Sequence, residues 1–327
     1  MRAMLIPLIA AISCACTASS GSGAAADSSA QEDAPAAVVP AMDFNADSAY
    51  TYIARQLEFG PRVPNTEAHR RAGEWLASEL RRHGAVVTLQ KADLHAFDGT
   101  TLHATNIIGQ FNPEAADRVL LVAHWDSRPW ADADPDESRR SEPVMGANDG
   151  ASGVGVLLEM ARLAGIATPQ RGLDILFVDA EDWGDEGIEE SWALGARYFT
   201  EHPFRPGYLP SEAIIVDMVG GENAVFPREF FSQQGAPGLV DRIWGVAHAA
   251  GYADRFPNRM GGAITDDHVQ FLAAGIPAID IIQYSEPTGF HPAWHTTGDT
   301  LGVISTPTLK AVGQTLTNYI FPPHPSR

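Results

Sequence analysis

The sequence predicts an α/β protein, a three-layer sandwich in which helices flank a mixed, mostly parallel central sheet. Apolar, β-branched runs typical of buried strands alternate along the chain with stretches of helical periodicity. The 327 residues are 45% hydrophobic and 19% charged, which fits one globular domain with a sizeable core.

We expect two helices first, over residues 47–60 and 65–84, the second capped by Asn65 and ended by Gly84. Two strands should follow as antiparallel neighbours at one side of the sheet. After them, strands and helices alternate, which implies parallel strands joined by helical crossovers. The expected strands are 85–93, 103–111, 117–126, 173–181, 212–220 and 276–283, and the later helices are 151–165, 191–202, 237–251 and 306–321.

The N-terminal residues precede this domain, which we place at residues 42–327. Residues 1–16 have a positively charged start and a short apolar stretch, which predicts a signal peptide rather than a membrane-spanning helix. Small residues before Cys14 and Cys16 suggest a lipoprotein site, and a plain cleaved signal is the alternative. Residues 17–41 are rich in Ala, Ser and Gly and predict a flexible tether. We therefore expect an exported protein, periplasmic or held at a membrane by a lipid anchor alone.

Acidic and histidine residues follow the predicted strands, at the edge where open α/β sheets bind ligands. Some come directly after a strand and others stand before a helix. They are His124, Asp126, Asp149, Glu181, Asp182, Asp217, Asp266, Asp267, His268 and His295. For Asp266, the preceding "GGAIT" is taken as the end of a short strand.

The stretch "DILFVDAEDWGDEG", residues 174–187, places several carboxylates after a buried strand. Like charges packed together need a cation or a shared proton. Both cysteines lie in residues 1–16, so carboxylates and histidines are the available ligands, a donor set typical of zinc. Calcium is disfavoured because it prefers oxygen ligands over a histidine such as His295.

Each of these residues also has a purely structural interpretation. Asp126 could cap a turn, and Asp149 could interact favourably with the dipole of the helix that follows it. His295 could belong to a hydrogen-bonded turn. His202 and His248 lie on helix patterns, so we exclude them from the site. The convergence of the whole set favours a metal centre.

Other function classes are disfavoured by charge and motif. The formal net charge of −19 argues against nucleic acid and anionic membrane surfaces as partners. The sequence has no H-E-x-x-H, no G-x-x-x-x-G-K-[ST] and no G-x-S-x-G, which disfavours a serine hydrolase.

The order of the motifs resembles the zinc-dependent M28 peptidase family over residues 45–325. The motifs are "HWD", "GANDGASGVG", "DAED", "IVDMVG" and "WHTTGDT". Within that family, "FGPRVPNTEAHRRAGEWL", "HWDSRPWADAD" and "TDDHVQFLAAGIPAIDII" are similar to the glutaminyl cyclases, especially bacterial members related to the animal enzymes. The resemblance implies a zinc-aminopeptidase-like fold and a single catalytic domain.

The resemblance also implies roles for individual residues. The expected ligands of one zinc ion are Asp149, Asp182 and His295, with Glu181 as general acid and base. Asp217 and Asp266 would be acidic partners of the substrate's amino group, and Trp294 an aromatic wall. The implied activity converts N-terminal glutamine of peptides and proteins to pyroglutamate with release of ammonia, and we expect a monomer.

Three features bear on the shape of the pocket. Asp182 stands where the animal enzymes carry Glu, which shifts the expected metal position slightly. The segment "SEPTGFHP" before Trp294 should reshape the rim. The segment between Trp183 and Trp192 is short, so the sequence does not identify which aromatic residue there faces the substrate.

A two-zinc aminopeptidase of the same family is the alternative. It would use His124, Asp149, Asp182, Asp217 and His295 as ligands, and Glu181 would activate a water molecule. The Asp266–Asp267 pair, Trp294 and "HWDSRPWADAD" favour the cyclase. A binding protein that has lost catalysis would show a damaged site, whereas every expected group is present here.

Overall fold

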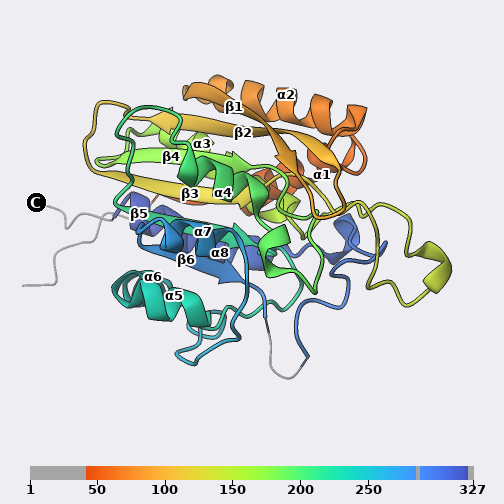
Figure 1. The fold of residues 1–327 in the computed structure, drawn as a ribbon. Coiled ribbons are helices and arrows are strands. Elements are labelled where there is room, and N and C mark those ends of the chain that lie inside the picture. The colour runs from red at the N-terminus through yellow and green to blue at the C-terminus, as the bar shows by residue number, and fades with distance from the viewer. Residues whose placement is uncertain (1–41, 285–287, 323–327) are drawn as a thin grey trace, which may run out of the picture.

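One six-stranded sheet forms the centre of the molecule (Figure 1). The structure is a computed structural model that describes residues 42–284 and 288–322. The strands are β1 (Val86–His95), β2 (Thr101–Phe111), β3 (Arg118–His124), β4 (Gly172–Val178), β5 (Glu212–Asp217) and β6 (Ala278–Ile282). Their order is β1-β2-β4-β3-β5-β6. β1, β2 and β4 pair antiparallel, and β4, β3, β5 and β6 pair parallel, so the predicted mixed, mostly parallel sheet is confirmed.

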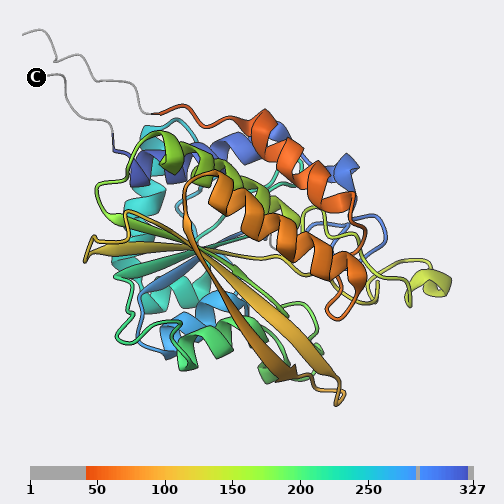
Figure 2. The ribbon, with the colours of Figure 1, turned by 90° about the horizontal axis from the view of Figure 1, so that it is seen from above.

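Helices cover both faces of this sheet (Figures 1 and 2). They are α1 (Ala46–Leu57), α2 (Glu67–Arg82), α3 (Ala151–Ile166), α4 (Leu194–Glu201), α5 (Phe230–Gly235), α6 (Pro237–Ala249), α7 (Asp267–Ala273) and α8 (Thr306–Ile320). The larger apolar core joins α1, α2, α3, α6 and α8 to one face, and a second core joins α4 and α7 to the other. Three short 3-10 turns lie at Glu137–Arg139, Glu189–Ser191 and Leu301–Val303.

The alternation of side chains along β3 fixes the register of the sheet centre. Leu121 and Ala123 point into the larger core, while Leu120 and Val122 point into the smaller one, and all four are fully buried. Burying one such Leu or Val contributes about 1.5–3 kcal/mol. A slip of one residue would exchange the two faces and move the last residue, His124, out of place.

The start of α2 differs from its prediction. Thr66, not Asn65, caps this helix, because its side-chain oxygen accepts the amide of His69. Asn65 has a φ of 71° and instead binds β2 through Thr101 and His103. Asparagine tolerates this left-handed conformation better than most residues, so it serves the turn and leaves the cap to its neighbour.

The segment before Asp266 was also predicted wrongly. Residues 261–265 do not form a strand, and Asp266 is the N-cap of α7, a helix that is not among the predicted elements. The helix α5 was missed as well, since both helices are at most seven residues long and show little periodicity.

The predicted signal peptide (residues 1–16) and tether (17–41) lie outside the described residues, so export and the lipid anchor stay predictions. Part of "SEPTGFHP", residues 285–287, is outside them too. Within the described ranges, no helix has the length and apolar character needed to cross a membrane.

Candidate active site

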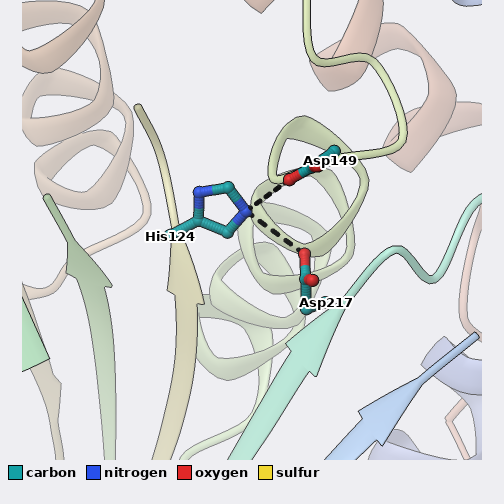
Figure 3. A group of neighbouring side chains, drawn as sticks. All are labelled: His124, Asp149 and Asp217. Atoms are coloured by element: carbon teal, nitrogen blue, oxygen red, sulfur yellow. Dashed lines mark hydrogen bonds and ion pairs between the residues drawn. The ribbon is translucent and has the colours of Figure 1, made fainter. Parts of the chain in front are cut away.

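Two strand ends and one helix start bring a first group of candidate metal ligands together (Figure 3). His124 ends β3, Asp217 ends β5, and Asp149 precedes the start of α3. The Nε2 atom of His124 lies 3.0 Å from Oδ1 of Asp149 and 3.2 Å from Oδ1 of Asp217. Gly150 permits this approach, because a Cβ there would lie 2.5 Å from the same nitrogen.

A second group shares Asp149 with the first. The Nε2 atom of His295 lies 3.2 Å from Oδ1 of Asp182 and 3.7 Å from Oδ2 of Asp149. One donor atom from each of these residues lies within 4.8 Å of the others, and all are buried. Donors held 2.0–2.2 Å from a tetrahedral zinc ion stand about 3.3 Å apart, close to these separations.

One donor atom of the second group also lacks another partner. Oδ1 of Asp182 is buried and makes no hydrogen bond among the described residues. Burial, together with the neighbouring Asp149, raises the pKa of Asp182, while His295 opposes the shift. Two buried carboxylates side by side, one with an unpaired oxygen, are costly unless a cation compensates them, so the group fits a metal ion.

Glu181 stands beside Asp182 at the edge of the pocket and is 8% exposed. Burial raises its pKa well above the usual range, and the charges of Asp266, Asp182 and Asp267 add to the shift against the opposing effect of His124. A carboxyl group with a raised pKa can both accept and donate a proton near neutral pH, as a general acid and base must.

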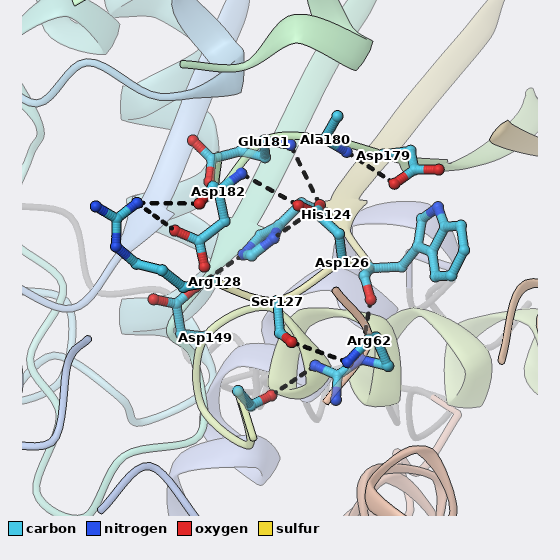
Figure 4. Close-up of polar contacts among 12 residues, drawn as sticks. Arg62, His124, Asp126, Ser127, Arg128, Asp149, Asp179, Ala180, Glu181 and Asp182 are labelled. Carbon is cyan, nitrogen blue, oxygen red and sulfur yellow. Dashed lines mark hydrogen bonds and ion pairs between the residues drawn. The ribbon is translucent and has the colours of Figure 1, made fainter. Parts of the chain in front are cut away.

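Two carboxylates bend the chain that carries Glu181 and Asp182 (Figure 4). Asp179 accepts the amide of Ala180, whose φ is 54°, so the chain turns immediately after β4. Asp126 then accepts the amides of Glu181 and Asp182, at 3.2 Å each. These bonds fix the backbone at Glu181, the predicted general acid and base, and at Asp182, a predicted metal ligand. Asp126 therefore does more than cap its own turn.

Asp149 is held in a similar way from its other side. Asp299 is 1% exposed and accepts the amides of Asn148 and Asp149 at 2.8 and 3.1 Å. Arg62 is fully buried and donates to the carbonyls of Met145 and Gly146. Both residues therefore fix the loop that precedes α3.

Left-handed backbone recurs where the chain delivers site residues. Ala180, Met218 and His295 have φ values of 54°, 47° and 52°. Ala180 precedes Glu181, and Met218 follows Asp217. His295 is itself a predicted metal ligand. None is a glycine, so each conformation is held by its surroundings.

These groups open into a cavity of about 420 Å³ with aromatic walls. Trp294 stacks on His295 with 3.7 Å between ring centroids, and Trp192 stacks on it at 6.0 Å. Tyr284 and Phe290 complete the wall. A larger groove of about 670 Å³ lies between α2 and β1–β2, but none of the predicted site residues line it.

The structure brings all of the predicted site residues together. Asp149, Glu181, Asp182, Asp217, Asp266, Trp294 and His295 line the cavity. His124 lies just beneath it and is 1% exposed. The excluded histidines lie elsewhere, His202 against Tyr198 and His248 against the carbonyl of Phe256.

Several site residues were not identified from the sequence. Trp192 is the aromatic residue that the 183–192 segment supplies to the cavity. Tyr284 and Phe290 lie on irregular chain, so no periodicity pointed to them. The sequence pointed to Asp126 but not to the amides that it accepts, and Arg128 was not singled out within "HWDSRPWADAD".

A third buried group adjoins the cavity behind Asp266. It contains Asp266, His268 and Asp280, and Nε2 of His268 lies 3.0 Å from Oε2 of Glu229. Burial would raise the pKa of Glu229, but His268 and the amides of the following helix lower it to about 2. Glu229 also accepts the amide of Ile264, so it anchors the segment that leads to Asp266.

Residues 106–320 match the model of peptidase family M28. The chain belongs to peptidase family M28. The M28 chain is 49% identical to a glutaminyl cyclase of Bacteroides thetaiotaomicron solved with N-acetylhistamine, with a TM-score of 0.85 over 86% of this chain and 99% of that one. It is 50% identical to a Zn-dependent exopeptidase from Parabacteroides distasonis, with a TM-score of 0.85 over 86% of this chain and 100% of that one. A glutaminyl-peptide cyclotransferase of Drosophila melanogaster is 26% identical over 270 residues, 75% of this chain and 72% of the relative.

Proposed function

We propose that this M28 enzyme is a zinc-dependent glutaminyl-peptide cyclotransferase. The observation that carries the proposal is one cavity lined by Glu181, Asp266 and Trp294 together with the group of Asp149, Asp182 and His295. The relatives named glutaminyl cyclase support the same activity. The substrates are peptides and proteins with an N-terminal glutamine.

A zinc ion held by Asp149, Asp182 and His295 would act as a Lewis acid toward the γ-carboxamide of the substrate. The aromatic walls hold the glutaminyl side chain and exclude water. Because the attacking amine and the carboxamide belong to the same residue, holding them in a reactive conformation supplies much of the rate.

Proton transfer falls to Glu181. The α-amine of the substrate attacks the amide carbon Cδ and a five-membered ring forms. Glu181 takes a proton from that amine and passes it to the departing nitrogen, which leaves as ammonia. Asp217 and Asp266 face the substrate's amino group from the cavity wall, and burial raises the pKa of Asp217 to about 7. The acyl group thus moves from one nitrogen to another, as in aminoacyl transfer.

The two-zinc aminopeptidase is the second candidate, because the first group, His124, Asp149 and Asp217, could hold a further metal ion. In that case Asp149 would bridge two ions, and the enzyme would release an N-terminal residue. The relative described as an exopeptidase is compatible with this activity.

One preparation separates the two functions. The zinc-loaded enzyme is incubated with a glutaminyl dipeptide and with a leucyl dipeptide, and ammonia, free amino acid and zinc per chain are measured. The cyclase predicts ammonia, one zinc per chain and no free leucine. Released leucine with two zinc ions per chain would replace the proposal with the aminopeptidase.

A further inference from the structure

The loop after β3 carries a buried cation that the proposed mechanism does not use. Arg128 belongs to "HWDSRPWADAD", and its side chain is 1% exposed. A buried guanidinium must place its N–H groups on acceptors, because an unpaired buried charge is strongly destabilising. Where those N–H groups go shows what the residue holds in place.

One edge of the guanidinium faces the segment that carries Asp182 (Figure 4). Nη1 donates to the main-chain carbonyls of Asp182 and Gly184, at 3.0 and 3.2 Å. The same nitrogen lies 3.6 Å from Oδ1 of Asp182, the buried oxygen that lacks a hydrogen bond. Arg128 therefore fixes the backbone of this ligand and faces its donor atom.

The other edge reaches the second ligand through an intermediate carboxylate. Nε donates to Oδ1 of Asp132 at 2.8 Å, and Nη2 donates to its other oxygen. Oδ1 of Asp132 lies 3.5 Å from Nδ1 of His295, and the amide of Ala133 donates to the carbonyl of His295. A carboxylate behind the outer nitrogen of a metal-binding histidine typically orients the ring and raises its basicity.

His124 shows the same arrangement, with Oδ1 of Asp126 lying 3.5 Å from its Nδ1 atom. Both carboxylates come from the one loop motif that contains Arg128. The motif thus supplies a carboxylate to each candidate ligand histidine, and Arg128 ties one of these carboxylates to Asp182.

The faces of the guanidinium are occupied as well. Its central carbon lies 4.9 Å from the ring centroid of Trp192 and 5.1 Å from that of Trp130. Trp192 is a wall of the cavity and stacks on His295. Cation–π contacts are stronger when the cation is desolvated, as it is here.

We infer that Arg128 is a positioning residue that couples the zinc ligands Asp182 and His295 to the Trp192 wall. The inference rests on the proposed metal site. A single planar side chain contacts two carbonyls, a bidentate carboxylate and two indole rings. Lysine carries the same charge but cannot reproduce this fork or stack in the same way.

Arg128→Lys removes the planar guanidinium group and its set of hydrogen bonds while keeping the positive charge. Zinc affinity is measured by titrating zinc into metal-free protein against a competing chelator, a readout that does not depend on the reaction catalysed. We expect affinity to fall by about 10- to 100-fold, the usual effect of losing an outer contact to a ligand. With zinc saturating, kcat should fall because the ligands are misaligned, and KM should rise because Trp192 is released.

Two further variants complete the test. Arg140→Lys is the matched control, because Arg140 lies in the same loop, is 46% exposed and donates to the carbonyl of Asp134. It should leave zinc affinity, kcat and KM unchanged. Asp132→Asn removes the carboxylate behind His295 at a partly exposed position, and its zinc affinity should also fall. This variant provides the test if Arg128→Lys does not fold.

Wild-type zinc affinity in either folded Arg128→Lys or Asp132→Asn would overturn the inference. So would a change in activity without any change in KM or zinc affinity. If the enzyme releases leucine rather than ammonia, the proposed function fails, whereas the effect on zinc affinity would still stand.

Discussion

Asp126 offers the sharpest test of how this site is built. Its two carboxylate oxygens each accept one main-chain amide, from Glu181 and Asp182, at 3.2 Å. The side chain is fully buried. In Asp126→Asn, one oxygen becomes an NH₂ group, which cannot accept a hydrogen bond. One of the two amides then faces a donor and stays unpaired.

The expected cost follows from that one lost bond. A hydrogen bond to a charged group contributes about 1.5–3 kcal/mol, and a buried unpaired N–H costs about 1–3 kcal/mol. Relief of repulsion among the neighbouring acids offsets part of this loss. We therefore expect the free energy of unfolding to fall by about 3 kcal/mol. Displacing Glu181 by about 1 Å should lower kcat by about 100-fold.

Urea unfolding and ammonia release from a glutaminyl peptide measure the two effects. Asp136→Asn is the control, since Asp136 lies in the same loop and caps a short turn at an exposed position. It should change stability by less than about 1 kcal/mol and leave turnover unchanged. If Asp126→Asn matched the wild type in both assays, these backbone bonds would not be what holds the site.

The remaining predictions concern proton transfer, pH and packing. Glu181→Gln should keep its zinc while ammonia release falls by about 100-fold or more, and turnover at the wild-type rate would contradict the assigned role. The pKa of Glu229 is lowered from 4.5 to about 2, so this group should stabilise the fold by about 3 kcal/mol above pH 4.5 and lose that contribution as pH falls toward 2. Glu229→Gln should therefore be less stable than the wild type at pH 7 in urea unfolding, and the difference should shrink in acid. Gly150→Ala should destabilise the protein by about 1–3 kcal/mol and reduce activity, whereas Gly245→Ala, whose Cβ would meet nothing within 4 Å, should not, as thermal unfolding and turnover would show.

The sequence was most informative where chemistry is tied to strand ends. The buried runs before His124, Glu181 and Asp217 predicted parallel strands, and parallel strands bring their ends to one edge. That topology brings His124, Asp182 and Asp217 together, whereas Asp149 and His295 reach the same edge from loops. The family resemblance then named the same residues that the structure places in one cavity.

The parts of the site that act through the backbone could not be predicted in this way. Asp126, Asp299 and Arg62 bind main-chain groups far away in sequence, and no spacing rule encodes such partners. The short helix α7 gave Asp266 a cap position that resembled the end of a strand. Trp192 needed the fold of its whole loop before its ring could be placed over His295.

The left-handed backbone at Ala180, Met218 and His295 has a consequence for the evolvability of this enzyme. This conformation costs Ala180 about 1–2 kcal/mol, and glycine would relieve that strain at the loss of one buried methyl group. Glycine in place of Met218 or His295 would instead remove a large buried side chain and destabilise the protein. A laboratory selection for heat resistance should therefore recover Ala180→Gly readily. Such a variant would be more stable to heat because the backbone strain at residue 180 is relieved. The turn before Glu181 would become more flexible, so the catalytic rate would fall.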